Sequence, residues 1–192
     1  RAPNITVVPP RYGLYEIASG ALMDHLKKFA PKVERFSVDE AFVEYTGLQK
    51  IYGDPEKAAK ELSASIKSEL GFTVNIGVSS NKLLAKMAGE LEKPDKVHTL
   101  WHHEIKDKMW PLPVGELYMC GRRTQEKLKA RGIFTIGQLA QSKENSLTPS
   151  LKSQGSMLWN FANGIYTDSG KAGAGNFQGM LPNHSETIGA KG

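Results

Sequence analysis

Two adjacent carboxylates, Asp39 and Glu40, are the residues of this sequence with the clearest capacity for chemistry. They lie between residues 33–36 and 41–45, whose aromatic and β-branched side chains are typical of strands. A carboxylate near the core of a sheet is costly unless it has a proton, a basic partner or a metal ion. Hard divalent cations such as Mg²⁺ take oxygen ligands, and neighbouring carboxylates suit them. The alternative is a solvated turn that holds two acids.

A second group of charges lies in residues 119–131, where five basic side chains face one acid, Glu126, for a net charge of +4. Two short helices are predicted here, at 114–119 and 124–131, joined by a tight turn. This pattern has the outline of a helix–hairpin–helix, whose backbone N–H groups can hold a phosphate. Counterion release from DNA favours such clustering. The alternative is an ordinary helical hairpin with a basic surface.

The remaining elements indicate how these groups are positioned. Strands are predicted at 5–8, 33–36, 41–45, 72–79 and 96–100, and helices at 12–29, 55–70 and 81–92. Gly77 marks a bulge or a close backbone approach within its strand. Because helices alternate with strands, and two strands are adjacent, we expect an α+β fold. Its palm-like sheet is mixed or antiparallel, with helices packed on it and the carboxylates at a strand junction.

Three lysines are spaced to share one side of the predicted helix 81–92. Lys82, Lys86 and Lys93 follow at offsets of four and seven, opposite the apolar face. By themselves they indicate a solvated helix surface.

Prolines at 111 and 113 indicate a domain boundary, after which short helices replace strands. Helices at 135–141 and 157–162 complete a small bundle, with a core of Leu139, Leu158, Trp159 and Phe161. Residues 167–183 have the composition of a flexible linker.

Composition limits the class of protein. The chain has 192 residues, of which 40% are hydrophobic and 23% charged, as in a soluble globular protein. No apolar run approaches the roughly 20 residues that span a bilayer, so we expect no membrane partner. The lone cysteine, Cys120, excludes an internal disulfide and suits a reducing compartment. The net charge of +5 favours an anionic partner. The chain begins at Arg1 without an initiator methionine, so we expect a piece of a longer protein.

Several motifs, in the right order, resemble those of Y-family, translesion DNA polymerases. Residues 37–42 (SVDEAF), followed by Thr46-Gly47, resemble the family's palm motif of serine, an aliphatic residue, Asp-Glu, a small residue and an aromatic residue. Residues 75–88 (NIGVSSNKLLAKMA), followed by Lys93-Pro94, resemble its second palm signature. Residues 117–133 are similar to its thumb hairpin. The bacterial UmuC-type, DNA polymerase IV-like group is the most similar.

The resemblance implies a template-directed DNA polymerase of damage tolerance, located in the bacterial cytoplasm at the nucleoid. Its partners would be primer–template DNA, deoxynucleoside triphosphates and a sliding clamp bound through other parts of the parent chain. Residues 1–111 would be a partial palm without its first catalytic strand and fingers. Residues 112–167 would be an all-α thumb with the helix–hairpin–helix. Residues 168–192 would be a linker and the start of a truncated DNA-gripping domain.

The resemblance also assigns site residues. Asp39 and Glu40 would be catalytic ligands of two Mg²⁺ ions, which lie roughly 3.5–4 Å apart in two-metal sites. Lys93, helped by Lys86, would bind the incoming nucleotide. The residues implied to hold the DNA backbone are Gly121, Arg122, Arg123, Lys127 and Lys129.

The sequence departs from the family pattern in two places. No carboxylate precedes Glu16, which lies inside the first predicted helix, so the family's first metal-binding aspartate is missing. We therefore expect the chain alone to have little polymerase activity. In addition, residues 119–121 read Met-Cys-Gly where Gly-x-Gly is common.

Two alternatives from other classes stay open. One is a naturally shortened, non-catalytic DNA-binding or regulatory protein on the same scaffold. The other is a palm-type nucleotide cyclase, against which the helix–hairpin–helix argues, since a small-molecule enzyme has no use for a duplex grip.

Overall fold

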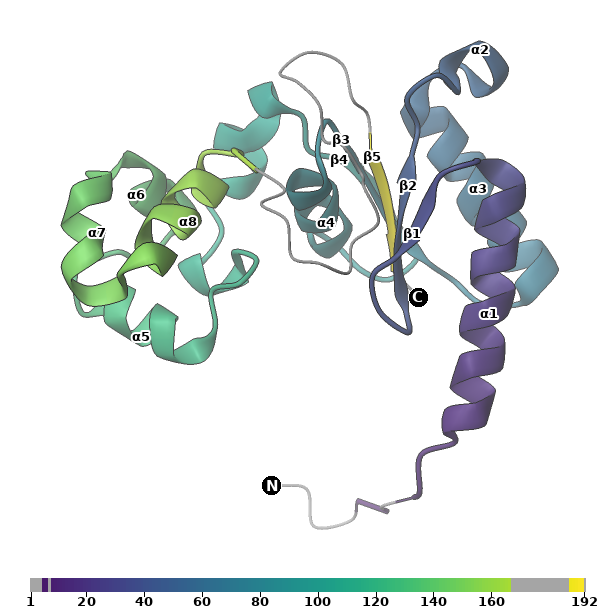
Figure 1. Ribbon diagram of the computed structural model, residues 1–192, viewed down its shortest axis with the longest axis horizontal. Coiled ribbons are helices and arrows are strands. Elements are labelled where there is room, and N and C mark those ends of the chain that lie inside the picture. The colour runs from purple at the N-terminus through teal and green to yellow at the C-terminus, as the bar shows by residue number, and fades with distance from the viewer. Residues whose placement is uncertain (1–4, 7, 167–186, 192) are drawn as a thin grey trace.

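The computed structural model describes residues 5–6, 8–166 and 187–191, which form one sheet with helices on both faces and a further group of helices beside it (Figure 1). The sheet has five strands in the order β1-β2-β5-β3-β4. Their bounds are Val33–Arg35 for β1, Glu40–Glu44 for β2, Thr187–Lys191 for β5, Asn75–Ser79 for β3 and Val97–Thr99 for β4. The predicted α+β class is confirmed.

The pairing of the strands is mixed, as predicted. β2 is antiparallel to both β1 and β5, β3 is antiparallel to β5, and β3 is parallel to β4. β5 therefore occupies the centre, where Gly189 is opposite Phe42 on one side and Gly77 on the other. This strand is not predicted by the sequence, because it depends on pairing with residues more than a hundred positions away. The predicted linker at 167–183 lies outside the described residues.

The predicted strand at residues 5–8 is wrong for the positions that the structure describes. Residues 5, 6 and 8 are not part of any strand, and Ile5 and Val8 are each 71% exposed. A short apolar run becomes a strand only where another strand offers its edge, and here none of the described strands pairs with it. The first turns of α1 (Tyr12–Phe29) likewise extend beyond the sheet (Figure 1), with Tyr12 and Ile17 exposed.

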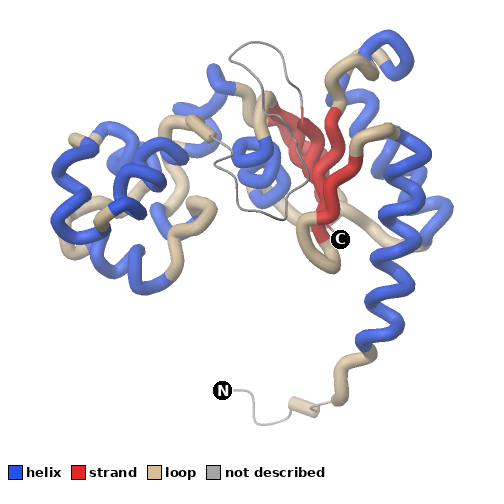
Figure 2. Tube along the Cα trace, in the orientation of Figure 1, coloured by secondary structure: helices blue, strands red, loops and turns tan. Residues whose placement is uncertain are grey.

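Two helices, α1 and α3 (Pro55–Leu70), cover one face of the sheet (Figure 2). α3 begins where it was predicted, because the Asp54 side chain accepts a hydrogen bond of 2.9 Å from the Lys57 N–H. It ends at Gly71, which has a left-handed φ of 76°. The core between these helices and the sheet includes Leu22, Leu26, Leu62, Ile66, Val43, Ile76 and Val78.

Helix α4 (Lys82–Glu90) covers the other face (Figure 2). Its start is fixed by Asn81, whose side chain accepts a hydrogen bond of 2.9 Å from the Leu84 N–H. The close approach predicted at Gly77 is confirmed, since a Cβ atom there would overlap the Ala85 carbonyl of α4. The apolar side of α4 does not pack into the first core. It belongs to a second core that it shares with the helical group.

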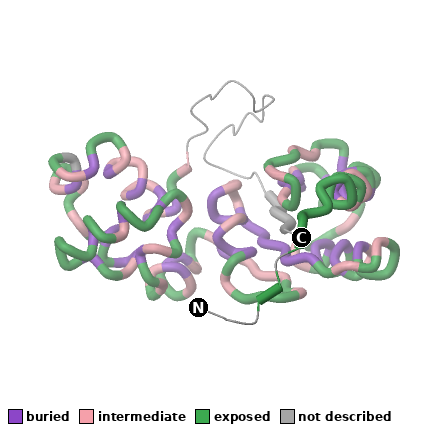
Figure 3. The backbone as a smooth tube through the Cα atoms, turned by 90° about the horizontal axis from the view of Figure 1, so that it is seen from below, coloured by how far each residue is buried: buried purple, intermediate pink, exposed green. Residues whose placement is uncertain are grey.

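The helical group follows β4 and lies on the far side of α4 from the sheet (Figure 1). It contains η1 (His102–Glu104), η2 (Ile105–Met109), η3 (Val114–Glu116), α5 (Arg122–Lys129), α6 (Ile136–Gln141), α7 (Glu144–Leu151) and α8 (Ser153–Ala162). A further short helix, α2 (Gln49–Tyr52), joins β2 to α3. Buried residues run through this group as well as through the sheet and its helices (Figure 3).

Several details of the helical group differ from the prediction. The predicted helix at 114–119 is only the 3-10 turn η3, because Leu117 has extended backbone angles. α7 is not predicted, since Pro149 and several polar residues obscure its pattern. Of the four predicted core residues, Leu139, Leu158 and Phe161 are buried, whereas Trp159 is half-buried and donates through Nε1 to the Ser142 carbonyl at 2.9 Å.

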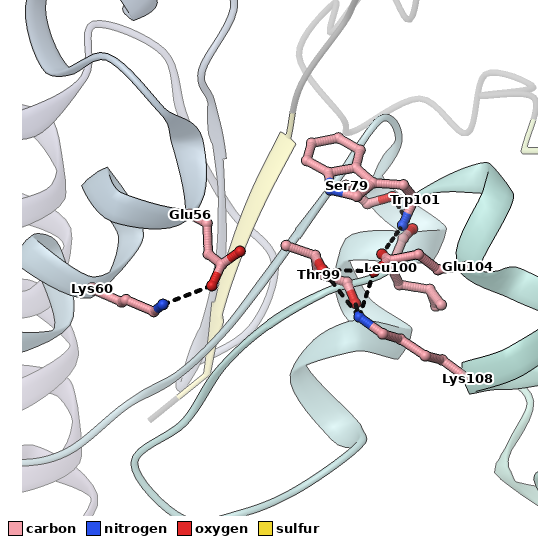
Figure 4. A network of polar contacts seen from close by, with 8 residues as sticks. All are labelled: Glu56, Lys60, Ser79, Thr99, Leu100, Trp101, Glu104 and Lys108. Carbon is pink, nitrogen blue, oxygen red and sulfur yellow. Dashed lines mark hydrogen bonds and ion pairs between the residues drawn. The ribbon is translucent and has the colours of Figure 1, made fainter.

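A polar network fixes the chain where it leaves the sheet (Figure 4). The Glu104 carboxylate accepts hydrogen bonds from the Trp101 N–H at 2.7 Å, the Thr99 hydroxyl at 3.1 Å and the Lys108 ammonium at 2.6 Å. Burial by itself would raise the pKa of Glu104, but these bonds and the charge of Lys108 outweigh it and lower the pKa. The network therefore stabilises the ionised carboxylate.

None of the helices in the described part of the chain combines the length and the hydrophobicity that crossing a bilayer requires.

Replacing Gly77 with alanine tests the close packing of α4. The new Cβ would overlap the Ala85 carbonyl oxygen and lie 2.5 Å from the Gly89 nitrogen, so backbone would have to move. We expect a loss of about 3 kcal/mol or more in the free energy of unfolding, measured by urea denaturation. The matched control is Gly20→Ala in α1, where nothing lies within 4 Å of the new atom. It should be neutral or stabilising by up to about 1 kcal/mol, and equal effects at both glycines would contradict the packing.

A second prediction concerns the acid sensitivity of the Glu104 network. Because the pKa of Glu104 lies below its usual 4.5, its stabilising effect is complete well above that pH and is lost as the pH falls through the lowered pKa. Glu104→Gln should cost about 1–3 kcal/mol at pH 7 and show a smaller further loss on acidification than the unmodified chain. Glu56→Gln, which breaks an exposed pair with Lys60, is the control and should change stability by less than about 1 kcal/mol. Parallel acid profiles for Glu104→Gln and the unmodified chain would count against the network.

Candidate functional site

The carboxylate pair lies at the hairpin between β1 and β2. The N–H groups of Phe36 and Ser37 both donate to the Glu40 carbonyl, at 2.9 and 3.1 Å, and so close the turn. The Ser37 hydroxyl donates to a carboxylate oxygen of Asp39 at 2.7 Å. Asp39 is exposed, whereas Glu40 is the first residue of β2 and is half-buried. The pair is thus on a turn, but only one of its members is fully solvated.

Glu40 is held by a lysine of α4. The Lys86 ammonium donates to both oxygens of its carboxylate, at 2.8 and 2.9 Å. The two side chains are only 19% and 14% exposed, for Lys86 and Glu40 respectively. The Lys86 Nζ also lies 5.5 Å from the ring centroid of Phe36 and 5.5 Å from that of Tyr118. Glu40 therefore meets α4 and Tyr118 at one point. Tyr118 directly precedes residues 119–131, which we call the basic hairpin.

Lys82 and Lys93, the other two lysines predicted to share a side of this helix, each pair with a different glutamate. Lys82 pairs with Glu34 of β1 at 2.6 Å, with 11% and 17% of the two side chains exposed, so the predicted solvated surface is wrong for Lys82 and Lys86. Lys93 comes after the end of α4 and pairs with Glu90 at 2.5 Å. The structure thus brings Lys86 into contact with Glu40, while Lys93 pairs with Glu90.

Asp39 and Glu40 supply oxygen donors of the kind that Mg²⁺ takes. Within the described residues, no group of three or more His, Cys, Asp or Glu side chains is arranged to hold a metal ion. Magnesium sites commonly use one or two carboxylates together with water and substrate phosphates. The donor set therefore fits one hydrated cation, while the described residues offer no complete ligand set for two.

The basic hairpin leads into α5. Gly121 is the residue before this helix, and its carbonyl accepts from the N–H groups of Thr124 and Gln125 at 2.9 and 3.0 Å. Met119 has a left-handed φ of 66°, a conformation that glycine adopts more easily. The methionine thus adopts this conformation at the place where the sequence departs from Gly-x-Gly. Burial raises the pKa of the Cys120 thiol, which disfavours the thiolate.

The predicted DNA-contacting side chains are all exposed, but their surroundings differ. Arg122 pairs with Glu126 at 3.2 Å, and Lys127 donates to the Ser150 carbonyl at 3.3 Å. Arg123 and Lys129 extend from α5 as exposed side chains. All four side chains are therefore at the surface of α5, and two of them, Arg122 and Lys127, have a polar partner there.

Tyr118 and Phe36 are site residues that the sequence analysis does not identify. Burial raises the pKa of Tyr118, and the negative charge of Glu40 adds to that effect, which reflects their proximity. Tyr118 is also stacked on Phe161 of α8, with ring centroids 6.1 Å apart. No local pattern signals these contacts, because they join segments that are distant in the sequence.

Comparison with known proteins bears on this site. Residues 1–90 match the impB/mucB/samB family. DNA polymerase IV of Clostridium acetobutylicum is 50% identical over 169 residues, which is 86% of this chain and 41% of that protein. DNA polymerase IV 1 of Bacillus subtilis is 39% identical over 164 residues, covering 85% of this chain and 39% of that protein. The chain thus spans about two-fifths of the length of these curated relatives.

Solved structures agree with the sequence matches. The crystal structure of DinB from Sulfolobus solfataricus has a TM-score of 0.75 and 28% identity, covering 87% of this chain and 50% of that one. The insertion ternary complex of Dbh DNA polymerase has a TM-score of 0.74 and 28% identity, covering 86% of this chain and 49% of that one. The resemblance inferred from residues 37–42 and 75–88 is confirmed.

Proposed function

We propose, on the premise that residues 1–90 belong to the impB/mucB/samB family, that this chain is the palm and thumb part of a Y-family DNA polymerase. The parent protein would add deoxynucleotides to a primer opposite damaged template bases. Residues 1–111 would form the partial palm and residues 112–167 the thumb. The core beneath the sheet is built from residues before the proposed boundary, whereas the second core joins α4 to the helical group across it.

One observation carries the proposal. Glu40 and Tyr118, which directly precedes the basic hairpin, are distant in the sequence and meet at Lys86. A polymerase needs metal-binding carboxylates beside a sequence-independent grip on the DNA backbone. A cyclase needs only the first of these two features.

The predicted site residues would bind two different groups, the metal ion and the incoming nucleotide. Asp39 and Glu40 would hold Mg²⁺, which when bound stabilises the negative charge that develops on phosphate oxygens during nucleotidyl transfer. Lys93 and Lys86 would bind the triphosphate of the incoming nucleotide as point charges. Their ammonium groups at present pair with Glu90 and Glu40, so each would exchange a carboxylate for a phosphate.

The segment from η3 to α5, which the sequence predicts as a helix–hairpin–helix, would position the duplex. The first N–H groups of α5 have no partner inside the helix, and together with Gly121 they suit a backbone phosphate. Arg122, Arg123, Lys127 and Lys129 would add charge around that phosphate. Such contacts fix the register of the DNA without reading its sequence.

A non-catalytic DNA-binding protein is the second candidate. It is favoured by the small number of metal ligands, since among the described residues no third side chain joins Asp39 and Glu40 to form a group that could hold a metal ion. Both candidates predict that the chain binds DNA, and both predict little nucleotide addition by the chain alone. They differ in whether the acidic pair binds a divalent cation.

The DNA-binding part of the proposal is tested by fluorescence anisotropy with a labelled primer–template. The double variant Arg123→Ala/Lys129→Ala should weaken binding and reduce the salt slope by about 2, since about one counterion is released per phosphate contact. The control is Lys57→Ala/Lys60→Ala on α3, whose side chains pair with Glu61 and Glu56 on the other side of the sheet and should leave DNA affinity unchanged. Equal losses in both double variants would show only non-specific charge effects.

A primer-extension assay with Mg²⁺ completes the test. We expect DNA binding with negligible extension, because the acidic pair alone does not hold two ions. Robust extension by this chain would overturn that expectation, and absence of DNA binding would overturn the proposal itself.

A further inference from the structure

Lys86 lies where three parts of the molecule meet, and this position suggests a role other than phosphate binding alone. We propose that Lys86 is a displaceable internal cation, which occupies Glu40 until a divalent metal ion binds and which Tyr118 of the helical group holds in place. Metal binding would then be coupled to the contact between the helical group and the sheet. This inference rests on the proposed metal-binding function of Asp39 and Glu40.

The geometry makes Lys86 and a metal ion mutually exclusive at Glu40. Both carboxylate oxygens accept from the ammonium, at 2.8 and 2.9 Å. A divalent cation would need at least one of these oxygens at roughly 2.1 Å, the Mg²⁺–oxygen distance. The ammonium would then be within a few ångströms of a doubly charged ion in a half-buried environment, where like charges repel strongly. Lys86 must therefore leave when the ion binds.

Two aromatic rings hold Lys86 in its present position. Phe36 comes from the β1–β2 hairpin and Tyr118 from the helical group, each 5.5 Å from the ammonium. Cations are attracted to ring faces at this separation. The Tyr118 ring is itself stacked on Phe161, so its position is set by α8. Removing Tyr118 should weaken the hold on Lys86 and so favour the metal ion.

A lysine outside the site offers a matched comparison. Lys32 pairs with Glu44 at 3.1 Å, and Glu44 belongs to the same strand as Glu40. Lys32→Met would remove one positive charge beside this strand, as Lys86→Met does, but its hydrogen bond is to Glu44 and not to the acidic pair.

The inference also identifies the ligand that Lys86 meets after displacement. The freed ammonium would move away from Glu40 and its two aromatic neighbours, because a cation bound at the acidic pair would repel it. A triphosphate that coordinates that cation would bring negative charge within its reach. Lys86 would thus exchange Glu40 for phosphate only once metal is bound.

Binding of Mn²⁺, followed by the electron paramagnetic resonance signal of the free ion, tests the proposal in the 192-residue chain without nucleotide or DNA. Lys86→Met should raise the Mn²⁺ affinity by about fivefold or more, the lower end of typical coupling between sites. Tyr118→Leu should give a smaller gain, and Lys86→Met/Tyr118→Leu should match Lys86→Met, because Tyr118 acts through the lysine. Lys32→Met should leave the affinity unchanged.

The outcomes separate this inference from the proposed function. If Asp39→Asn and Glu40→Gln leave Mn²⁺ binding intact, the acidic pair is not the metal site and the proposed function fails. If those variants weaken binding but Lys86→Met does not strengthen it, only the displaceable cation is refuted. An equal gain in Lys32→Met would also refute it, since the effect would then be one of net charge.

A second experiment uses the unmodified chain, so that its result does not depend on whether the variants fold. Acetylation of individual lysines, followed by mass spectrometry, should proceed faster at Lys86 when Mg²⁺ is added and at an unchanged rate at Lys32. Lys86 reactivity that does not respond to Mg²⁺, at concentrations where the ion is bound, would overturn the proposal.

Discussion

The close approach of α4 to β3 determines the arrangement of the rest of the molecule. Gly77 has no side chain to separate the strand from the Ala85 carbonyl, and Gly89 faces it from the helix. The short separation lets one side of α4 enter the core of the helical group while its lysines reach β1 and β2. A bulkier residue at position 77 would move all of these contacts together.

The electrostatics of the site follow from that packing. Two lysines of α4 lie against a half-buried surface of the sheet, and burying their charges is costly unless each has an acidic partner. Glu34 and Glu40 are those partners. Glu40, which serves as a structural counterion, therefore also lies beside Asp39 at the turn of the hairpin. In this way the same carboxylate can stabilise the metal-free fold and be available to a metal ion. The helical group takes part, because Tyr118 lies against the lysine.

Local signals in the sequence predict much of the sheet and its helices. Asp54, Asn81 and Gly71 mark helix ends through short-range hydrogen bonds and backbone conformation, so the bounds of α3 and α4 are predicted to within two residues. The hairpin that carries the acidic pair is predicted because its strands are adjacent in the chain.

Contacts between distant segments are not predicted. β5 depends on two partner strands far away in the chain, and the run at residues 5–8 has strand-like composition without a partner. The same applies to the site, where spacing places the lysines on one side of a helix but does not show that Glu34 and Glu40 meet them. The role of Tyr118 depends on the docking of the helical group, which no short motif encodes.

The central claim is that Asp39 and Glu40 form a divalent cation site at the β1–β2 hairpin. Paramagnetic broadening of amide NMR signals by substoichiometric Mn²⁺ tests it directly, because the effect falls steeply with distance from the ion. The account predicts that the amides of residues 37–41 broaden first, followed by those around Lys86, while α6 and the outer side of α3 are unaffected. Broadening centred elsewhere, or spread evenly over the acidic residues of the surface, would contradict it.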